Sequence, residues 1–128
     1  MRITEDQQPW CPEFDGQVKA SCIQTGLFAG PVGSSIHPWA DPNLTDAFYQ
    51  DPLDIDATKF HVYAHEWTPT HVDFYVDNQK ISRINQSPAY PMQFMLAIYE
   101  LPGADVNAAY PKEFVVGYVR GYQPEAGY

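Results

Sequence analysis

Hydrophobic and polar residues alternate most regularly at 72–77, where the sequence reads Val-Asp-Phe-Tyr-Val-Asp. A period of two is typical of a strand that buries one face and exposes the other. Asp77-Asn78 ends this run, and both residue types tolerate the positive φ angles that a tight type I′ hairpin turn requires. A Thr-Pro turn separates the strand from an earlier extended run at 60–67. The pattern therefore predicts two adjacent antiparallel strands, the second of which enters a hairpin.

Further strands are predicted where short apolar runs lie between residues typical of turns. With the two already named, the predicted strands are 18–28, 60–67, 72–77, 79–85, 92–99 and 113–122. The Gly- and Ser-bearing stretch 29–35 is expected to form a loop, and the Asp- and Pro-rich stretch 38–58 a second, longer loop. No heptad repeat and no helical period interrupts this pattern. The expected fold is an all-β antiparallel sandwich that occupies a single domain, residues 1–128.

Charge narrows the range of partners. The 128 residues carry a formal net charge of −9 at pH 7, which repels phosphate backbones and anionic lipids. Neither nucleic acid nor a membrane is therefore an expected partner, and no apolar run approaches the roughly 18 residues of a membrane-spanning helix. A neutral polysaccharide is compatible with this charge.

The cellular compartment stays open. Residues 1–10 are polar and lack the apolar core of a signal peptide, so we expect either a cytoplasmic protein or one whose leader has been removed. Cys11 and Cys22 could form a disulfide or remain half-buried thiols, and two cysteines do not identify a compartment.

The run Phe-His-Val-Tyr-Ala-His-Glu-Trp-Thr-Pro at 60–69, followed by Phe-Tyr-Val-Asp at 74–77, resembles family 16 glycoside hydrolases, the laminarinase-like enzymes that cut β-glucans. Residues 87–96 resemble the penultimate core strand of that family, and residues 114–123 resemble its closing strand. Glu-Phe-Asp-Gly at 13–16 resembles its opening motif. The resemblance implies a concanavalin A-like jelly-roll sandwich. It divides the chain into an N-terminal block, 1–36, and a C-terminal half, 37–128, with the fold incomplete between them.

Catalysis in the family implies two carboxyl groups on one strand, in the order Glu-x-Asp-x-x-Glu or a close variant, and this sequence contains no Glu-x-Asp-x-x-Glu. Glu13 begins such a pattern, but Val18 stands where the second glutamate belongs, and valine can neither donate a proton nor attack carbon. Two interpretations remain. Either the catalytic strand is missing from between Ser35 and His37, or Glu5 is the tail of a strand whose nucleophile lies outside this chain.

Three functions follow from these interpretations. The first is a family 16 scaffold that is inactive alone because the paired carboxylates are absent. The second is an active endo-glucanase completed by another chain, and the third is a lectin-like module that binds carbohydrate without cleaving it. Whether the chain is an enzyme therefore remains open at this point.

Sugar recognition relies on aromatic faces and short polar side chains. The candidate substrate-binding residues are Trp10, Trp39, Tyr99 and Glu100, with Tyr49 and Tyr90 as further aromatic candidates, because all six are expected in loops or at strand ends. Trp67 is assigned to the core. No metal site is predicted, because His61 and His65 lie four residues apart on one strand, or about 13 Å, which is too far to share an ion. No cofactor is expected.

Assembly is predicted from an apolar stripe. Phe94, Leu96 and Ile98 alternate on one face of a predicted strand and need a covering sheet. A jelly roll that lacks central strands would also leave unpaired strand edges, and unpaired edges favour pairing with another chain. We therefore expect a homo-oligomer that pairs strands between copies, or a subunit held by a partner chain.

Overall fold

Eight strands make up the regular structure of the computed structural model, which describes residues 21–27, 31–53, 55–98 and 110–125 together with the backbone of 13–14 and 17–18. In chain order they are β1 (Glu13–Phe14), β2 (Gln17–Val18), β3 (Ser21–Leu27), β4 (Val32–Pro38), β5 (Ala47–Asp51), β6 (Tyr63–Trp67), β7 (Val72–Val76) and β8 (Gln79–Ile84). The described residues contain no helix, and hence none that could span a membrane.

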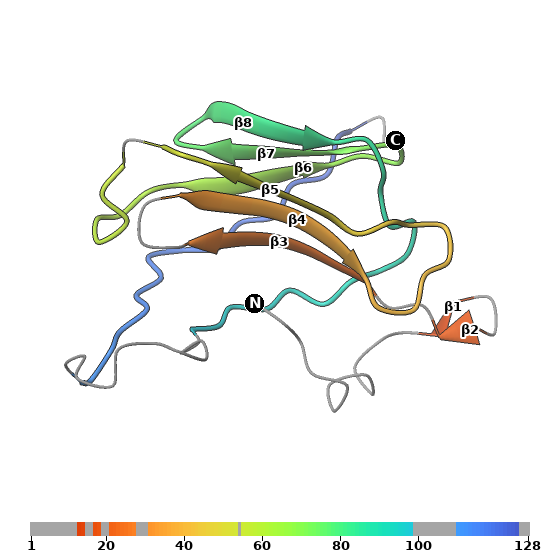
Figure 1. Ribbon diagram of the computed structural model, residues 1–128, viewed down its shortest axis with the longest axis horizontal. Helices are drawn as coiled ribbons and strands as arrows, with labels where there is room; N and C mark the ends of the chain where they lie inside the picture. The colour runs from red at the N-terminus through yellow and green to blue at the C-terminus, as the bar shows by residue number, and fades with distance from the viewer. Residues whose placement is uncertain are drawn as a thin grey trace.

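The strands form two antiparallel sheets of three strands and one small two-stranded ribbon (Figure 1). Strands β3, β4 and β5 make the first sheet in that order, and strands β6, β7 and β8 make the second. Each sheet is a simple meander, because neighbouring strands in space are also neighbours in sequence. The predicted class, an all-β antiparallel sandwich, is confirmed, and its two sheets are consistent with a partial jelly roll.

The hairpin between β7 and β8 forms as the sequence predicts. Asp77 and Asn78 both adopt positive φ angles, of 48° and 65°, which a type I′ turn requires. Asp77 also holds the chain that leads into β6: its backbone N–H donates to the Val62 carbonyl at 2.8 Å, and its carboxylate accepts the Val62 N–H at 2.8 Å. The predicted pairing of 60–67 with 72–77 is confirmed, with Trp67 opposite Val72 and Tyr63 opposite Val76.

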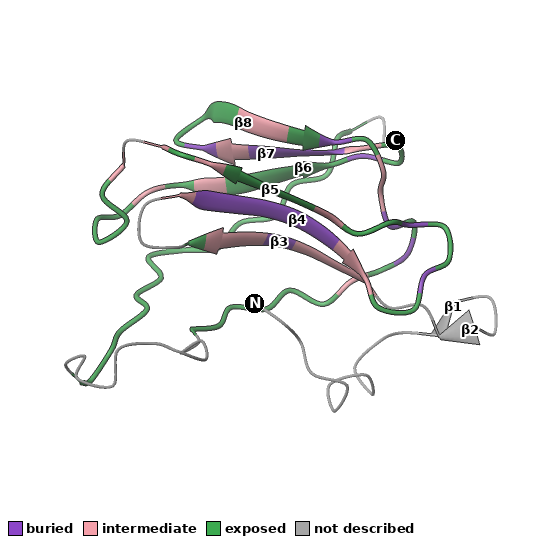
Figure 2. Ribbon diagram, in the orientation of Figure 1, coloured by how far each residue is buried: buried purple, intermediate pink, exposed green. Residues whose placement is uncertain are grey.

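The core lies between the two sheets. Its buried members are Ile36 from β4, Leu44 from the following loop, Val72 and Phe74 from β7, and Ile84 from β8. Figure 2 shows the buried residues concentrated along β4 and β7, the central strand of each sheet. Alternation decides which residues point inward, because Val72, Phe74 and Val76 share one face of β7 and are each no more than 4% exposed.

Two predicted loops are wrong in part. The stretch 29–35 contributes most of β4, and the stretch 38–58 contains β5. Gly33, Ser34 and Ser35 favour turns when taken locally, yet they lie in a central strand with a neighbour on each side. Burial of Val32 and Ile36, at 1% and 0% exposure, outweighs the weak local preference of the small residues between them. The position between Ser35 and His37, where one interpretation places the missing catalytic strand, thus lies inside the continuous strand β4.

Two predicted strands are also wrong. Residues 92–98 and 113–122 form no strand, although the first predicted segment ends at Tyr99, which lies outside the described residues. Both described segments are extended and largely exposed (Figure 2). Phe94, Leu96 and Ile98, for example, are 65%, 51% and 56% exposed. Their alternation is real, but in the described structure no neighbouring strand pairs with their backbone groups.

The assignment of Trp67 to the core needs correction as well. Its side chain points to the same face of the second sheet as its partner Val72, but β6 is an edge strand and the indole remains 39% exposed. The ring is instead held by its Nε1–H, which contacts the Ser87 hydroxyl at 2.9 Å and the Pro88 carbonyl at 3.0 Å. Trp67 therefore anchors the chain that follows β8.

Candidate functional site

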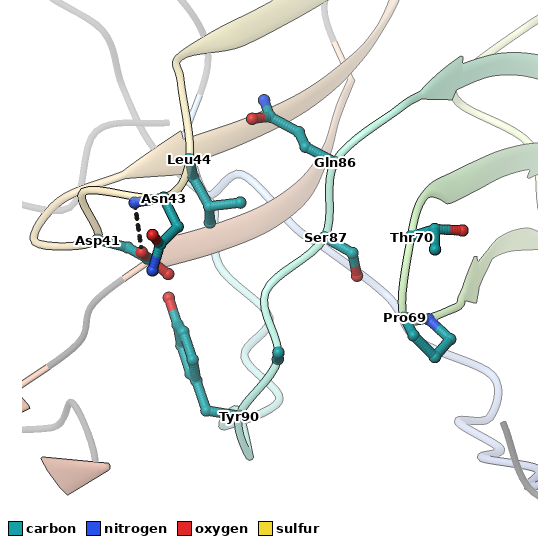
Figure 3. A pocket seen from close by; sticks show the side chains of 9 residues that line it. Asp41, Asn43, Leu44, Pro69, Thr70, Gln86, Ser87 and Tyr90 are labelled. Carbon is teal, nitrogen blue, oxygen red and sulfur yellow. Dashed lines mark hydrogen bonds between the residues drawn. The ribbon is translucent and has the colours of Figure 1, made fainter. Parts of the chain in front are cut away.

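A hollow of about 330 Å³ opens where three connections meet at one end of the sandwich (Figure 3). It lies between the β4–β5 loop, the β6–β7 turn and the segment that follows β8. The lining residues are Asp41, Asn43, Leu44, Pro69, Thr70, Gln86, Ser87, Ala89 and Tyr90. Figure 3 shows the side chains of Asp41, Asn43 and Tyr90 directed toward one another at one side of this hollow. The hollow thus combines short polar side chains with one aromatic ring, and a few convergent polar groups of this kind can orient a small ligand.

Most of the lining polar groups have partners within the chain. Gln86 binds Thr45 three times, accepting from its backbone N–H at 2.9 Å and its hydroxyl at 3.3 Å and donating to its carbonyl at 2.5 Å. The Tyr90 hydroxyl donates to Ser21 at 2.6 Å, and Asp41 accepts the Asn43 N–H at 2.9 Å. These hydrogen bonds hold the segment after β8 against the first sheet. Because they occupy most of the polar groups of the lining, mainly the rim of the hollow remains available to a ligand.

Of the four predicted substrate-binding residues, Trp10, Trp39, Tyr99 and Glu100, Trp39 is the one whose side chain the structure describes. It follows β4, is 37% exposed, and lies with its ring centroid 6.0 Å from that of His37 at an interplanar angle of 41°. His37 in turn contacts the Asp46 carboxylate across the β4–β5 loop. The indole is thus positioned by its neighbours while part of its surface stays open to solvent.

The structure describes the other predicted site residues to different extents. Glu5, Trp10, Tyr99 and Glu100 lie outside the described residues, and of Glu13 the structure describes the backbone, paired in β1 with Val18 of β2. The two additional aromatic candidates differ in exposure: Tyr49 on β5 is 51% exposed, whereas Tyr90 is 6% exposed and packs into the wall of the hollow. Sequence reasoning missed Gln86 and Ser87, whose roles depend on contacts 41 and 19 residues away.

Strands β3 and β4 contain no carboxyl group. They are the described strands up to His37 that are long enough to carry a paired-carboxylate motif. Such a motif spans six residues, and β3 and β4 are each seven residues long, but they read Ser-Cys-Ile-Gln-Thr-Gly-Leu and Val-Gly-Ser-Ser-Ile-His-Pro. Neither contains Asp or Glu. Cleavage with retention needs two carboxyl groups about 5–5.5 Å apart, and these strands supply none.

The pKa shifts of the described carboxyl groups also run in one direction. The pKa of Asp56 is lowered by hydrogen bonds from Thr58, that of Asp77 by hydrogen bonds from the Val62 N–H and His61, and that of Asp73 by Arg83. A general acid in a glycosidase requires a raised pKa, so that the proton is retained until the leaving group needs it. These three side chains are stabilised as anions instead.

Asp73 is the most strongly held of them. It lies on the outward face of β7, yet it is 1% exposed because two cations cover it. Arg83 binds both carboxylate oxygens, through Nε at 2.6 Å and Nη2 at 2.7 Å, and Lys80 Nζ lies 3.2 Å away. These contacts lower the pKa of Asp73 to about 2. The network joins β7 to β8 across the face opposite the core.

His61, which precedes β6, and His65, which lies in it, contact different partners. His61 Nδ1 lies 2.7 Å from the Asp77 carboxylate, whereas His65 Nε2 lies 2.7 Å from the Thr25 hydroxyl on β3 of the opposite sheet. His65 keeps a solvent-exposed edge, but its ring packs edge-on against Phe74 at 4.8 Å, and desolvation lowers its pKa to about 4. In the part of the chain that the structure describes, no three His, Cys, Asp or Glu side chains are grouped as metal ligands would be.

Cys22 on β3 is a free thiol, and burial raises its pKa. Its potential partner Cys11 lies outside the described residues.

The two stacked antiparallel meanders define a partial β-sandwich, an architecture that by itself does not identify a function. The chain belongs to glycosyl hydrolases family 16, whose sequence model matches residues 12–115. A beta-glucanase of Acetivibrio thermocellus is 37% identical over 59 residues, which cover 44% of this chain and 18% of that protein. A second beta-glucanase of the same species is 38% identical over 61 residues, covering 46% and 18%. The matched stretch thus spans less than a fifth of either relative, and no solved structure matches the chain.

Proposed function

We propose that this chain is a family 16 scaffold, folded as one domain, that does not hydrolyse β-glucan by itself. One observation carries the proposal: β3 and β4, the described strands long enough to hold the catalytic motif ahead of His37, contain no carboxyl group. General acid/base cleavage of a glycosidic bond needs a proton donor and a nucleophile on opposite sides of the anomeric carbon. The anionic, cation-bound state of Asp73 further supports a structural role for this carboxylate.

The experiment is reducing-sugar release from laminarin, lichenan and agarose by the purified chain, with an active beta-glucanase as positive control. We expect no turnover above the background of buffer. Hydrolysis of any of the three polymers would contradict the proposal, and Glu5→Gln and Glu13→Gln would then identify the responsible carboxyl group. Activity that appears only when a second chain is added would favour the alternative of a glucanase completed by a partner.

A second candidate function is carbohydrate binding without cleavage. The observation that favours it is the partly exposed indole of Trp39 in the same loop as Asn43, an exposed polar residue that lines the hollow. Retardation in native gels that contain laminarin or lichenan tests this function, with Trp39→Ala as the variant and Phe60→Ala, which removes an exposed ring elsewhere, as its control. Binding that Trp39→Ala abolishes and Phe60→Ala leaves intact would support it. Equal mobility with and without polymer would reject it.

A further inference from the structure

Exposed apolar side chains are concentrated in the two extended segments that form no strand. Of the 18 large hydrophobic residues that are exposed in the described structure, 11 lie in 92–98 and 110–122. The first segment reads Met-Gln-Phe-Met-Leu-Ala-Ile and contains no charged residue, although the whole chain carries −9. Its three alternating apolar side chains, Phe94, Leu96 and Ile98, together leave roughly 300 Å² uncovered, and an exposed apolar surface of that size is a candidate for an interaction surface.

The contacts of the preceding residues determine where this segment leaves the sandwich. Gln86 is bound to Thr45 beside the start of β5, and Tyr90 is bound to Ser21 at the start of β3. The chain therefore crosses the end of the first sheet from β5 to β3. Residues 92–98 consequently begin on the side of the sandwich where β3 faces β6, as the hydrogen bond between Thr25 and His65 shows.

The opposite side of the sandwich offers a place for an added strand. There β5 and β8 each pair on one side only among the described strands, so both present an unpaired edge. A groove of about 470 Å³ runs between them, lined by residues 45–49 of the β5 side and 83–86 of the β8 side. Tyr49 in this groove is 51% exposed. An extended, uncharged peptide that pairs with such an edge gains backbone hydrogen bonds and covers the exposed ring of Tyr49.

We infer that segment 92–98 of one copy of this chain adds as a strand to the groove between β5 and β8 of a second copy. Segment 92–98 is the donor of this contact, and the groove between β5 and β8 is the acceptor. The two lie on opposite sides of one molecule, so the contact is head-to-tail and continues from copy to copy instead of closing as a symmetric dimer. The second extended segment is the poorer donor, since Glu113 and Arg120 bring charge and Gly117 and Gly121 weaken strand pairing.

The proposed contact is small, so we expect the association to be weak. A segment of seven residues covering one groove buries less than the roughly 1,200 Å² of a standard interface, and such contacts are weak. Because every copy is acidic, the charge of the whole molecule opposes association, so higher ionic strength should strengthen it. The inference does not depend on whether the chain binds or cleaves a polysaccharide.

Analytical ultracentrifugation of the full chain over about 1–100 µM tests the inference, since this is the range expected for a contact of that size. We expect the average mass to rise with concentration beyond that of a dimer. Leu96→Lys disables the donor and Tyr49→Lys the acceptor, so each variant alone should associate at least tenfold more weakly. Val119→Lys, which places the same charge at a similarly exposed position of the other segment, should behave as the unaltered chain. Circular dichroism melts confirm that each variant is folded.

Mixing the two disabled chains gives the decisive measurement. Leu96→Lys retains an intact groove and Tyr49→Lys an intact donor, so an equimolar mixture should form a one-to-one dimer and nothing larger. Pairing of segment 92–98 with the same segment of another copy would instead leave Tyr49→Lys as strongly associated as the unaltered chain and keep Leu96→Lys monomeric in the mixture, and that result would overturn the inference. So would an unaltered chain that stays monomeric at every concentration, or equal weakening by Val119→Lys and Leu96→Lys.

Discussion

Replacing Asp73 with asparagine removes one charge from the β7–β8 network while keeping the size and shape of the side chain. The carboxyl group has a pKa of about 2 in the folded protein, against 3.8 when unperturbed, and the first cause is its hydrogen bond from Arg83. A difference of nearly two pKa units corresponds to about 2 kcal/mol of folding free energy that depends on the ionised form. Arg83 and Lys80 are 44% and 45% exposed, so solvent screening keeps the loss at or below this value.

The pH dependence follows from the direction of the shift. A folded pKa below the unfolded pKa means that the contribution of Asp73 is fully present above about pH 5 and is lost as the pH falls toward 2. Asp73→Asn should therefore lower the unfolding free energy by about 2 kcal/mol at pH 7, equivalent to a melting temperature about 7 °C lower for a chain of this length. The two proteins should converge in stability near pH 2.

Urea unfolding followed by tryptophan fluorescence at pH 7, and thermal melts by circular dichroism between pH 2 and 7, measure both quantities. Glu125→Gln, which removes an equal charge from an exposed position, controls for the change in net charge. A loss below about 0.5 kcal/mol at pH 7 would place Asp73→Asn among ordinary surface substitutions and refute the reasoning. So would a difference between the two proteins that stays constant down to pH 2.

Three further substitutions test other contacts. Because the folded pKa of His65 is about 4 and the unfolded value is 6.5, stability should fall as pH drops from about 6.5 to 4, and melts of His65→Gln should lack that decline. Trp67→Phe removes both indole hydrogen bonds and should cost about 1–2 kcal/mol in urea unfolding; an unchanged midpoint would contradict the anchoring role. Asn78→Val forces a branched residue to a φ of 65° and should destabilise by about 1–2 kcal/mol, whereas Asn78→Gly should be tolerated.

Local signals explain why the second sheet could be predicted from sequence. The alternation at 72–77 and the Asp77-Asn78 turn act within a few residues, so β7, the hairpin and β8 follow from short-range rules. Strand β4 could not be found this way, because Gly33 and its neighbours favour a turn until β3 and β5 flank them. For segments 92–98 and 113–122 the prediction gives strands that the structure lacks. Their alternation is a local signal, but a strand also needs a neighbouring strand, and the local sequence does not show whether one is present.

The candidate site was less predictable than the fold. Trp39 could be named because an aromatic residue in a polar loop is conspicuous in sequence. The hollow beside it could not, because it depends on Gln86 reaching Thr45 and on Tyr90 reaching Ser21, pairs separated by 41 and 69 residues. Absence of a paired-carboxylate motif was visible from sequence, while the pairing of β3 and β4 came from the structure.

The two hydrogen bonds between Asp77 and Val62 have a consequence for the order in which this chain folds. All three strands of the second sheet come from the continuous stretch 63–84, and the same aspartate that bends the β7–β8 turn also holds Val62 at the entrance to β6. Contacts this close in sequence lose little chain entropy when they form, so they form quickly. We expect the second sheet to assemble first. Its exposed Val72 and Phe74 then form the apolar surface against which β4 packs. Substitutions at Asp77 should accordingly slow refolding, whereas substitutions at Ile23 on β3, at the far edge of the later sheet, should mainly accelerate unfolding.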